Sequence, residues 1–70
     1  MTNEEAKEAF LSGVPIIHKD DYRHINIHYS HISAIIYRRI NGRVCVSVEL
    51  ADRCGHSVTI APVKNIFAEA

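Results

Sequence analysis

The chain has 70 residues, of which 47% are hydrophobic and 23% are charged, and its formal net charge at pH 7 is zero. This length predicts one domain, and a domain this small buries only about 60% of its unfolded surface. The composition excludes a disordered chain, and no apolar run approaches the ~18 residues of a transmembrane helix. The opening residues MTNEEAKEAF are acidic and polar, unlike a secretory signal, so we expect a cytoplasmic protein without a membrane partner.

Charge is unevenly distributed along the chain. Residues 1–21 hold five acidic residues and two lysines, whereas residues 22–48 hold four arginines and no acidic residue. This asymmetry is the main electrostatic indication of a partner. The two cysteines, Cys45 and Cys54, fit neither a CxxC pair nor a disulfide framework. We therefore expect two reduced thiols, with a Cys45–Cys54 disulfide as the less favoured alternative.

A short helix is predicted for residues 3–12. Thr2 or Asn3 can cap it, and acidic residues occupy its first turn, where the helix dipole favours them. Gly13 and Pro15 end it.

The segment after this helix contains one clear strand and one ambiguous stretch. Residues 14–18, all apolar except His18, predict a first strand, with its proline at the strand start or at an edge. In residues 22–30, Ile25, Ile27 and Tyr29 alternate as in a strand, but Ile25 and Tyr29 also fall at helical spacing with Ile32 and Ile36. The residue types are poor helix formers, which favours a strand or an irregular extended arm.

The strongest local signal in the sequence is Asn41-Gly42 between two alternating apolar segments. Both central residues of a type I′ turn need a positive φ, which asparagine and glycine tolerate best. The sequence therefore predicts a hairpin with a two-residue turn. In this register the opposed pairs are Ile35 and Val48, Tyr37 and Val46, and Arg39 and Val44.

The two faces of the predicted hairpin differ in composition. The outer face carries Ile36 and Ile40 interleaved with arginines, so it either binds a partner or is covered by Phe10 and Leu11 of the helix. The inner, core face is predicted to hold Ile35, Tyr37, Val44, Val46, Val48 and Leu50, and the outer face Ile36, Arg38, Ile40, Arg43, Cys45, Ser47 and Glu49.

The C-terminal third predicts three further short elements. Residues 52–55 form a turn, and residues 57–60 form a strand that buries Val58 and Ile60. Residues 61–65 interrupt this strand as one turn of 3₁₀ helix, and Ile66 and Phe67 form a last short strand.

This order of elements, with the segment GRVCVSVELADRCGHSVTIAPVKNIF, resembles that of small SH3-like β-barrels. The resemblance implies a mainly β (α+β) fold, an antiparallel barrel of about five strands in residues 14–70 behind a helix in residues 1–13. Tryptophan is absent and the tyrosines form no peptide-binding motif, so the resemblance predicts a fold and no specificity. The chain also loosely resembles small proteins carried by phages and mobile elements.

Neither a metal site nor a catalytic site is predicted, and no cofactor is expected. His24, His28 and His31 share a face only in a helix; in a strand, His24 and His28 lie about 13 Å apart. Cys54-Gly55-His56 pairs a thiol with an imidazole, but no third residue is at hand to orient them. A metal-binding or thiol enzyme is therefore only a distant alternative.

The arginines of YRRINGR are the best functional candidates. The leading hypothesis is a non-enzymatic module that binds a protein partner or itself, and the alternative is a nucleic-acid-binding accessory protein, against which the zero net charge argues. The candidate residues are Ile36, Arg38, Ile40 and Arg43 for the first hypothesis, and Arg23, Arg38, Arg39 and Arg43 for the second.

Overall fold

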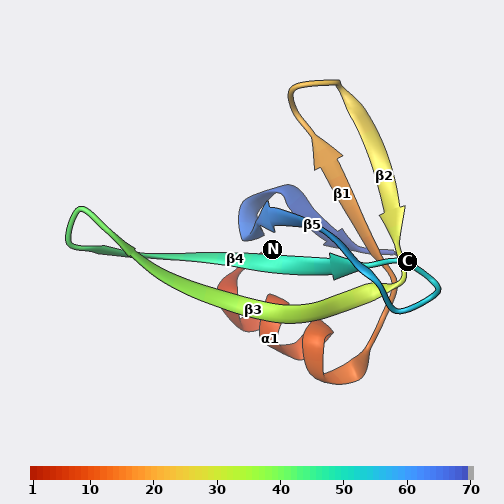
Figure 1. Cartoon of the computed structure of the whole chain (residues 1–70), viewed down its shortest axis with the longest axis horizontal. Coiled ribbons are helices and arrows are strands. Elements are labelled where there is room, and N and C mark those ends of the chain that lie inside the picture. The colour runs from red at the N-terminus through yellow and green to blue at the C-terminus, as the bar shows by residue number, and fades with distance from the viewer. Residues whose placement is uncertain (70) are drawn as a thin grey trace.

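The computed structural model describes residues 1–69, except for the side chain of Val58. One helix is followed by six strands, with a 3₁₀ turn before the last of them (Figure 1). The elements are α1 (Asn3–Ser12), β1 (Ile16–Asp20), β2 (Ile25–Tyr29), β3 (His31–Ile40), β4 (Arg43–Ala51), β5 (Ser57–Pro62), η1 (Val63–Asn65) and β6 (Ile66–Ala68).

α1 has the predicted bounds, and both of its ends are fixed by local hydrogen bonds. The Thr2 hydroxyl accepts from the Glu5 backbone N–H at 3.1 Å, and the Glu5 carboxylate accepts from the Thr2 N–H at 2.9 Å. This reciprocal capping box satisfies two N–H groups that would otherwise lack partners. At the other end Gly13 takes a φ of 70°, and its N–H donates to the Ala9 carbonyl.

The strands form two three-stranded antiparallel sheets, with strand orders β2-β1-β6 and β3-β4-β5. The ambiguous stretch is extended and supplies β2, and only Ser30 separates it from β3. The prediction of a mainly β fold with a short N-terminal helix is therefore confirmed. Within residues 1–69 the strand pairing does not close into one ring, so the SH3-like barrel stays a prediction.

The β3–β4 hairpin has the predicted turn and register. Asn41 and Gly42 have φ angles of 50° and 78°, as a type I′ turn requires. A β-bulge at Ser33 was not predicted; its hydroxyl donates to the Glu49 carbonyl at 3.1 Å. Because the bulge adds one residue to β3, it places Ile32 on the same face as Ile35.

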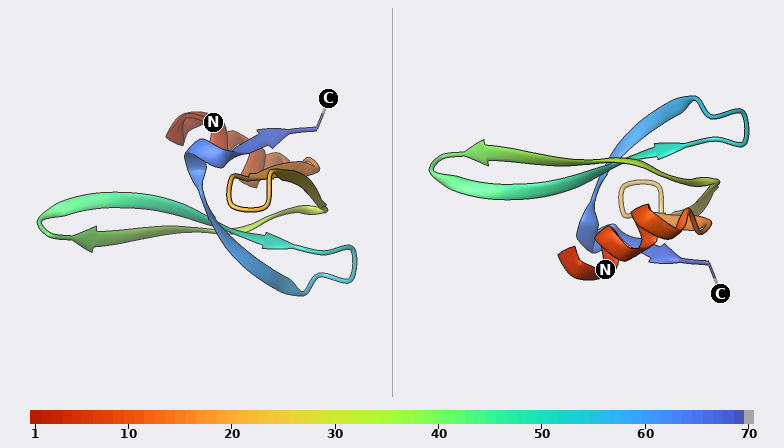
Figure 2. Two further views of the ribbon diagram at one scale, coloured as in Figure 1. Left: turned by 90° about the horizontal axis from the view of Figure 1, so that it is seen from above. Right: turned by 90° about the horizontal axis from the view of Figure 1, so that it is seen from below.

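The core lies between the inner face of the β3-β4-β5 sheet and the layer formed by α1, β1 and β6 (Figure 2). The helix packs through its small residues Ala6 and Ala9, which allow it to approach the sheet closely. The largest fully buried side chains are Ile16, Ile32, Val48, Leu50 and Ile66.

Three residues that we expected in the core are exposed. Tyr37 and Val44 are 66% and 59% exposed, because ten-residue β3 extends about 33 Å whereas ten-residue α1 extends only about 15 Å. The helix therefore covers only the base of the hairpin. Ile60 is 52% exposed because it pairs with Glu49 on the outer face. Val58, which we also expected to be buried, lies outside the described side chains.

The helix does not cover the outer face of the hairpin. Phe10 and Leu11, the residues considered for that role, are themselves 38% and 72% exposed, and Ile40 on the outer face is 51% exposed. Among the described residues, no helix has the length and apolar character that a membrane span requires.

Candidate functional site

The distal part of the β3–β4 hairpin projects beyond the rest of the molecule (Figure 1). We call residues 37–45, with the sequence YRRINGRVC, the hairpin tip; every one of them is exposed. The tip contains three arginines and no acidic residue. It is therefore a basic two-stranded ribbon with solvent on both faces.

Apolar and basic side chains occur together on each face of the hairpin tip. The register places Ile40 beside Arg43 on the outer face, and Arg39 opposite Val44 on the inner face. Tyr37, two residues before Arg39, lies on that inner face as well. Exposed apolar side chains next to arginines are typical of a protein-contact surface.

The structure brings three of the four predicted partner-binding residues together at the tip. Arg38, Ile40 and Arg43 share the outer face and are exposed. Ile36 lies on the same face but is half-buried opposite Ser47, at the base of the ribbon.

Sequence reasoning missed Tyr37, Val44 and Ile60 as surface residues. The signal that could have found the first two is the length of the hairpin, since its two alternating segments are longer than one short helix can cover. For Ile60 the signal is strand alternation, because buried Ala61 and exposed Ile60 lie on opposite faces.

The fourth arginine of the nucleic-acid hypothesis lies elsewhere. Arg23 is in the β1–β2 turn, and its Nε contacts Asp20 Oδ2 at 2.8 Å. That side-chain hydrogen bond is the main cause that lowers the pKa of Asp20. Arg38, Arg39 and Arg43 have no ion-pair partner among residues 1–69, so they keep their charge available for a ligand.

The three clustered histidines do not share a helical face. His24 is in the β1–β2 turn with a φ of 55°, His28 is on β2 and His31 is on β3. His28 Nδ1 lies 3.2 Å from Glu69 Oε1, and His31 Nδ1 lies 3.1 Å from Ser30 Oγ. In the described part of the chain, no three metal-ligating side chains are grouped to hold an ion.

The turn that carries Cys54 and His56 is organised by Asp52. Its Oδ1 accepts from the backbone N–H groups of Cys54 and His56 at 2.9 and 3.0 Å, and the latter bond is the main cause that lowers the pKa of Asp52. Asp52 Oδ2 is 3.7 Å from His56 Nδ1, which is too long for a hydrogen bond. Asp52 thus shapes the turn, and sequence reasoning did not foresee this role. Cys45 and Cys54 are both exposed and free.

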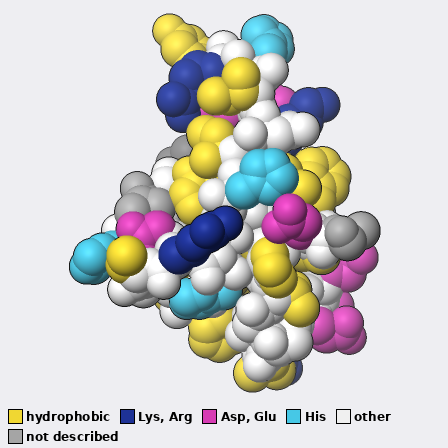
Figure 3. Space-filling model, turned by 90° about the vertical axis from the view of Figure 1, so that its right-hand side faces the viewer, with side chains coloured by type: hydrophobic (Ala, Val, Ile, Leu, Met, Phe, Trp, Pro, Cys, Tyr) yellow, Lys and Arg dark blue, Asp and Glu magenta, His cyan; other side chains and the backbone are white. Residues whose placement is uncertain are grey.

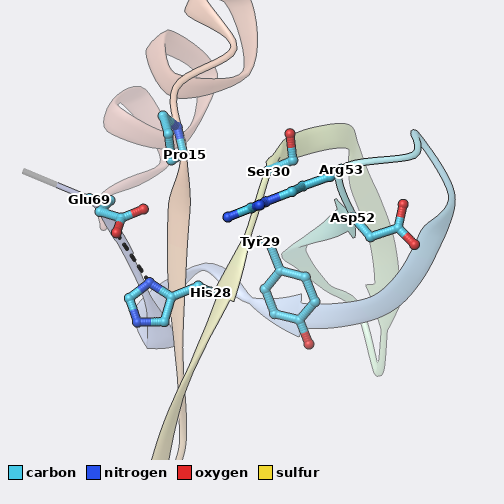
Figure 4. A pocket seen from close by; sticks show the side chains of 7 residues that line it. All are labelled: Pro15, His28, Tyr29, Ser30, Asp52, Arg53 and Glu69. Atoms are coloured by element: carbon cyan, nitrogen blue, oxygen red, sulfur yellow. Dashed lines mark ion pairs between the residues drawn. The ribbon is translucent and has the colours of Figure 1, made fainter.

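A polar hollow of about 400 Å³ lies at the end of the molecule away from the hairpin tip. Arg53 reaches into it, whereas Asp52 points away, and His28 and Glu69 pair at one side (Figure 4). At this end of the molecule, basic, acidic and histidine side chains are interspersed among apolar ones (Figure 3). The hollow therefore has mixed charge, in contrast to the uniformly basic hairpin tip.

No protein-family model matches the chain, and neither a curated protein nor a solved structure matches it.

Proposed function

We propose that this chain is a non-enzymatic interaction module that binds a protein partner or a second copy of itself through the hairpin tip. The observation that carries the proposal is the exposure of Tyr37, Ile40 and Val44 at 66%, 51% and 59% on one projecting ribbon. A two-stranded ribbon without a covering layer is at best marginally stable in water. A partner seated on the tip would bury these side chains and order the ribbon.

The proposal includes the SH3-like barrel and a cytoplasmic location. The support for the barrel is the path of the chain, which passes from one sheet to the other at Ser30 and returns through η1 to pair β6 with β1. The support for a reducing compartment is the pair of exposed free thiols.

Co-purification with matched variants tests the proposal. The tip variant Tyr37→Ser with Ile40→Ser removes one apolar side chain from each face of the ribbon. The control, Tyr22→Ser with Ile25→Ser, removes the same residue types from the β1–β2 turn and β2, where they are 94% and 46% exposed. Bound proteins are quantified by mass spectrometry for the wild type and both variants.

The expected result is a protein, or a second copy of the chain, that is retained by the wild type and the control and is lost from the tip variant. Equal recovery with all three proteins would contradict a role for the tip. Equal circular dichroism spectra for the three proteins exclude unfolding as the cause of a loss.

Nucleic-acid binding is a second candidate, favoured by one observation. Arg38, Arg39 and Arg43 have no ion-pair partner among residues 1–69 and lie on a two-stranded ribbon, which is a shape that the major groove of DNA admits. Binding through these three contacts would weaken with salt, with a slope of log K against log salt of about −2.7. Anisotropy of a labelled generic duplex, titrated at several salt concentrations, distinguishes this candidate from the first.

A further inference from the structure

The hairpin tip has a counterpart on the same molecule, the solvent-facing side of α1. Glu4, Glu8 and Leu11 are spaced four and three residues apart and therefore share one helix face, opposite the buried Ala6 and Ala9. Leu11 is 72% exposed. We call this surface, completed at its margin by Glu5 and Lys7, the acidic helix face.

The two surfaces are complementary in charge and in character. The tip has three arginines and no acidic residue, and the acidic helix face has three glutamates and one lysine. Each also exposes large apolar side chains, Ile40 and Val44 on the tip and Leu11 on the helix. The zero net charge of the chain therefore results partly from two opposite patches on different parts of the molecule.

The two surfaces of one molecule do not meet. α1 packs on the base of β3, whereas the tip projects away from the helix in all three ribbon views (Figures 1 and 2). A tip can therefore reach an acidic helix face only on another molecule.

We infer that the occupant of the hairpin tip is the acidic helix face of a second copy of this chain, an inference that rests on the proposed function. A symmetric tip-to-tip contact would instead bring arginines against arginines, which opposes association. The tip-to-helix contact is heterologous, so each bound copy leaves one tip and one helix face free and the assembly grows beyond a dimer. Both surfaces are short, so each contact is weak and is weakened further by salt.

Two charge-reversal variants test this arrangement by sedimentation velocity over roughly 10 µM to 1 mM protein. In this experiment the tip variant is a different protein from the one used for co-purification: it carries Ile40→Ser with Arg43→Glu. The helix variant carries Glu8→Lys with Leu11→Ser. We expect the wild type to associate with increasing concentration and each variant to lose at least about tenfold in association constant. Lys19→Glu, an exposed charge reversal on β1, is the control and should associate like the wild type.

An equimolar mixture of the two variants gives the decisive result. The tip variant keeps a native helix face and the helix variant keeps a native tip, so the mixture should form a 1:1 complex that neither variant forms alone. A helix variant that still self-associates would overturn the inference and leave the tip as a binding surface for another partner. A wild type that stays monomeric over the whole range would also overturn it, while the co-purification experiment decides the proposed function separately.

Discussion

The basal and distal halves of the β3–β4 hairpin share one ladder and one alternating pattern, yet they have opposite environments. At the base, Val48 and Leu50 are fully buried in the core cluster, which includes Ala6 and Ala9 of α1; four residues from Val48 on the same face of β4, Val44 is 59% exposed. The difference shows that alternation determines which side chains share a face, whereas the size of the covering layer determines whether that face is buried. In a 70-residue chain the covering layer ends before the hairpin does.

The same substitution in the two halves should have very different effects. Val48→Ala removes buried methyl groups and leaves a cavity, so we expect it to lower the free energy of unfolding by about 2–3 kcal/mol. Val44→Ala on the same strand and face should change it by less than about 0.5 kcal/mol. Urea unfolding of both variants measures the difference, and equal losses would mean that the tip is covered in solution.

The turn that closes the distal half should be sensitive to the backbone and not to packing. Gly42 has a φ of 78°, and no atom lies within 4 Å of where its Cβ would be. Gly42→Val should therefore cost about 1–2 kcal/mol through strain alone. Gly42→Asn should lower the free energy of unfolding much less, because asparagine tolerates a positive φ. If the valine variant melted at the wild-type temperature, the turn would not be type I′ and the register would be wrong.

Most of the fold was predictable because its signals are local. Thr2 and Gly13 mark the helix ends, and Asn41-Gly42 sets the hairpin register. The bulge at Ser33 was not predictable, because a serine followed by an alanine carries no turn signal. Burial of Tyr37 was predicted wrongly, since whether a face is covered depends on the lengths of elements distant in the chain.

For the candidate site, the sequence predicted the shared face of Arg38, Ile40 and Arg43 because strand alternation is a local property. It did not place Arg23 away from them, since that depends on which sheet each turn belongs to. The pairing of Arg23 with Asp20 is local in sequence, but only the structure shows its geometry.

The cap of α1 should stabilise the basal half specifically. Thr2→Ala removes the hydroxyl that caps the helix, so we expect a loss of about 1 kcal/mol. Thr2→Ser keeps a capping hydroxyl and should retain most of the stability. Hydrogen exchange should speed up at Ile32 and Val48 in the alanine variant and stay unchanged in the tip. A comparable increase at Tyr37 would show that the helix also orders the distal half.

Acid should weaken the same cap. The pKa of the Glu5 carboxyl is lowered chiefly by the hydrogen bond from the Thr2 backbone N–H. A folded pKa below the unfolded one, which is about 4.3, means that this contribution is complete above that pH and is lost as the pH falls through the folded value. Glu5→Gln should therefore flatten the loss of stability in acid. A Thr2→Ala background keeps the backbone N–H that donates to the Glu5 carboxylate, so the same change should still flatten most of the loss there. Disappearance of the effect in that background would show that the carboxylate depends on the Thr2 hydroxyl instead.

The smallest effect is expected for the cysteines. Cys45 in the tip and Cys54 in the β4–β5 turn are both exposed and free, so Cys45→Ser with Cys54→Ser should change stability by less than about 0.5 kcal/mol. Omitting reductant should not change the melting temperature of the wild type. A stoichiometric Cys45–Cys54 bond, found by mass spectrometry of protein taken directly from cells, would refute this expectation.

The bulge at Ser33 makes the number of residues in β3, and not only their identity, part of the fold. Because Ser33 bulges out of the ladder, Ile32 pairs with Leu50 on the core face; a regular ladder that kept Ser33 would put Ser33 opposite Leu50 and turn Ile32 toward solvent. Deleting Ser33 would instead join Ile32 to Ala34 in a regular ladder and leave Ile32 in the core. We expect deletion of Ser33 to be tolerated and insertion of a further residue between Ile32 and Ala34 to be selected against, because the ladder would have to absorb a second extra residue to keep Ile32 in the core. Apart from loss of Ser33, natural length variation in this chain should be concentrated beyond Ile36, where the hairpin can lengthen or shorten without moving a single core side chain.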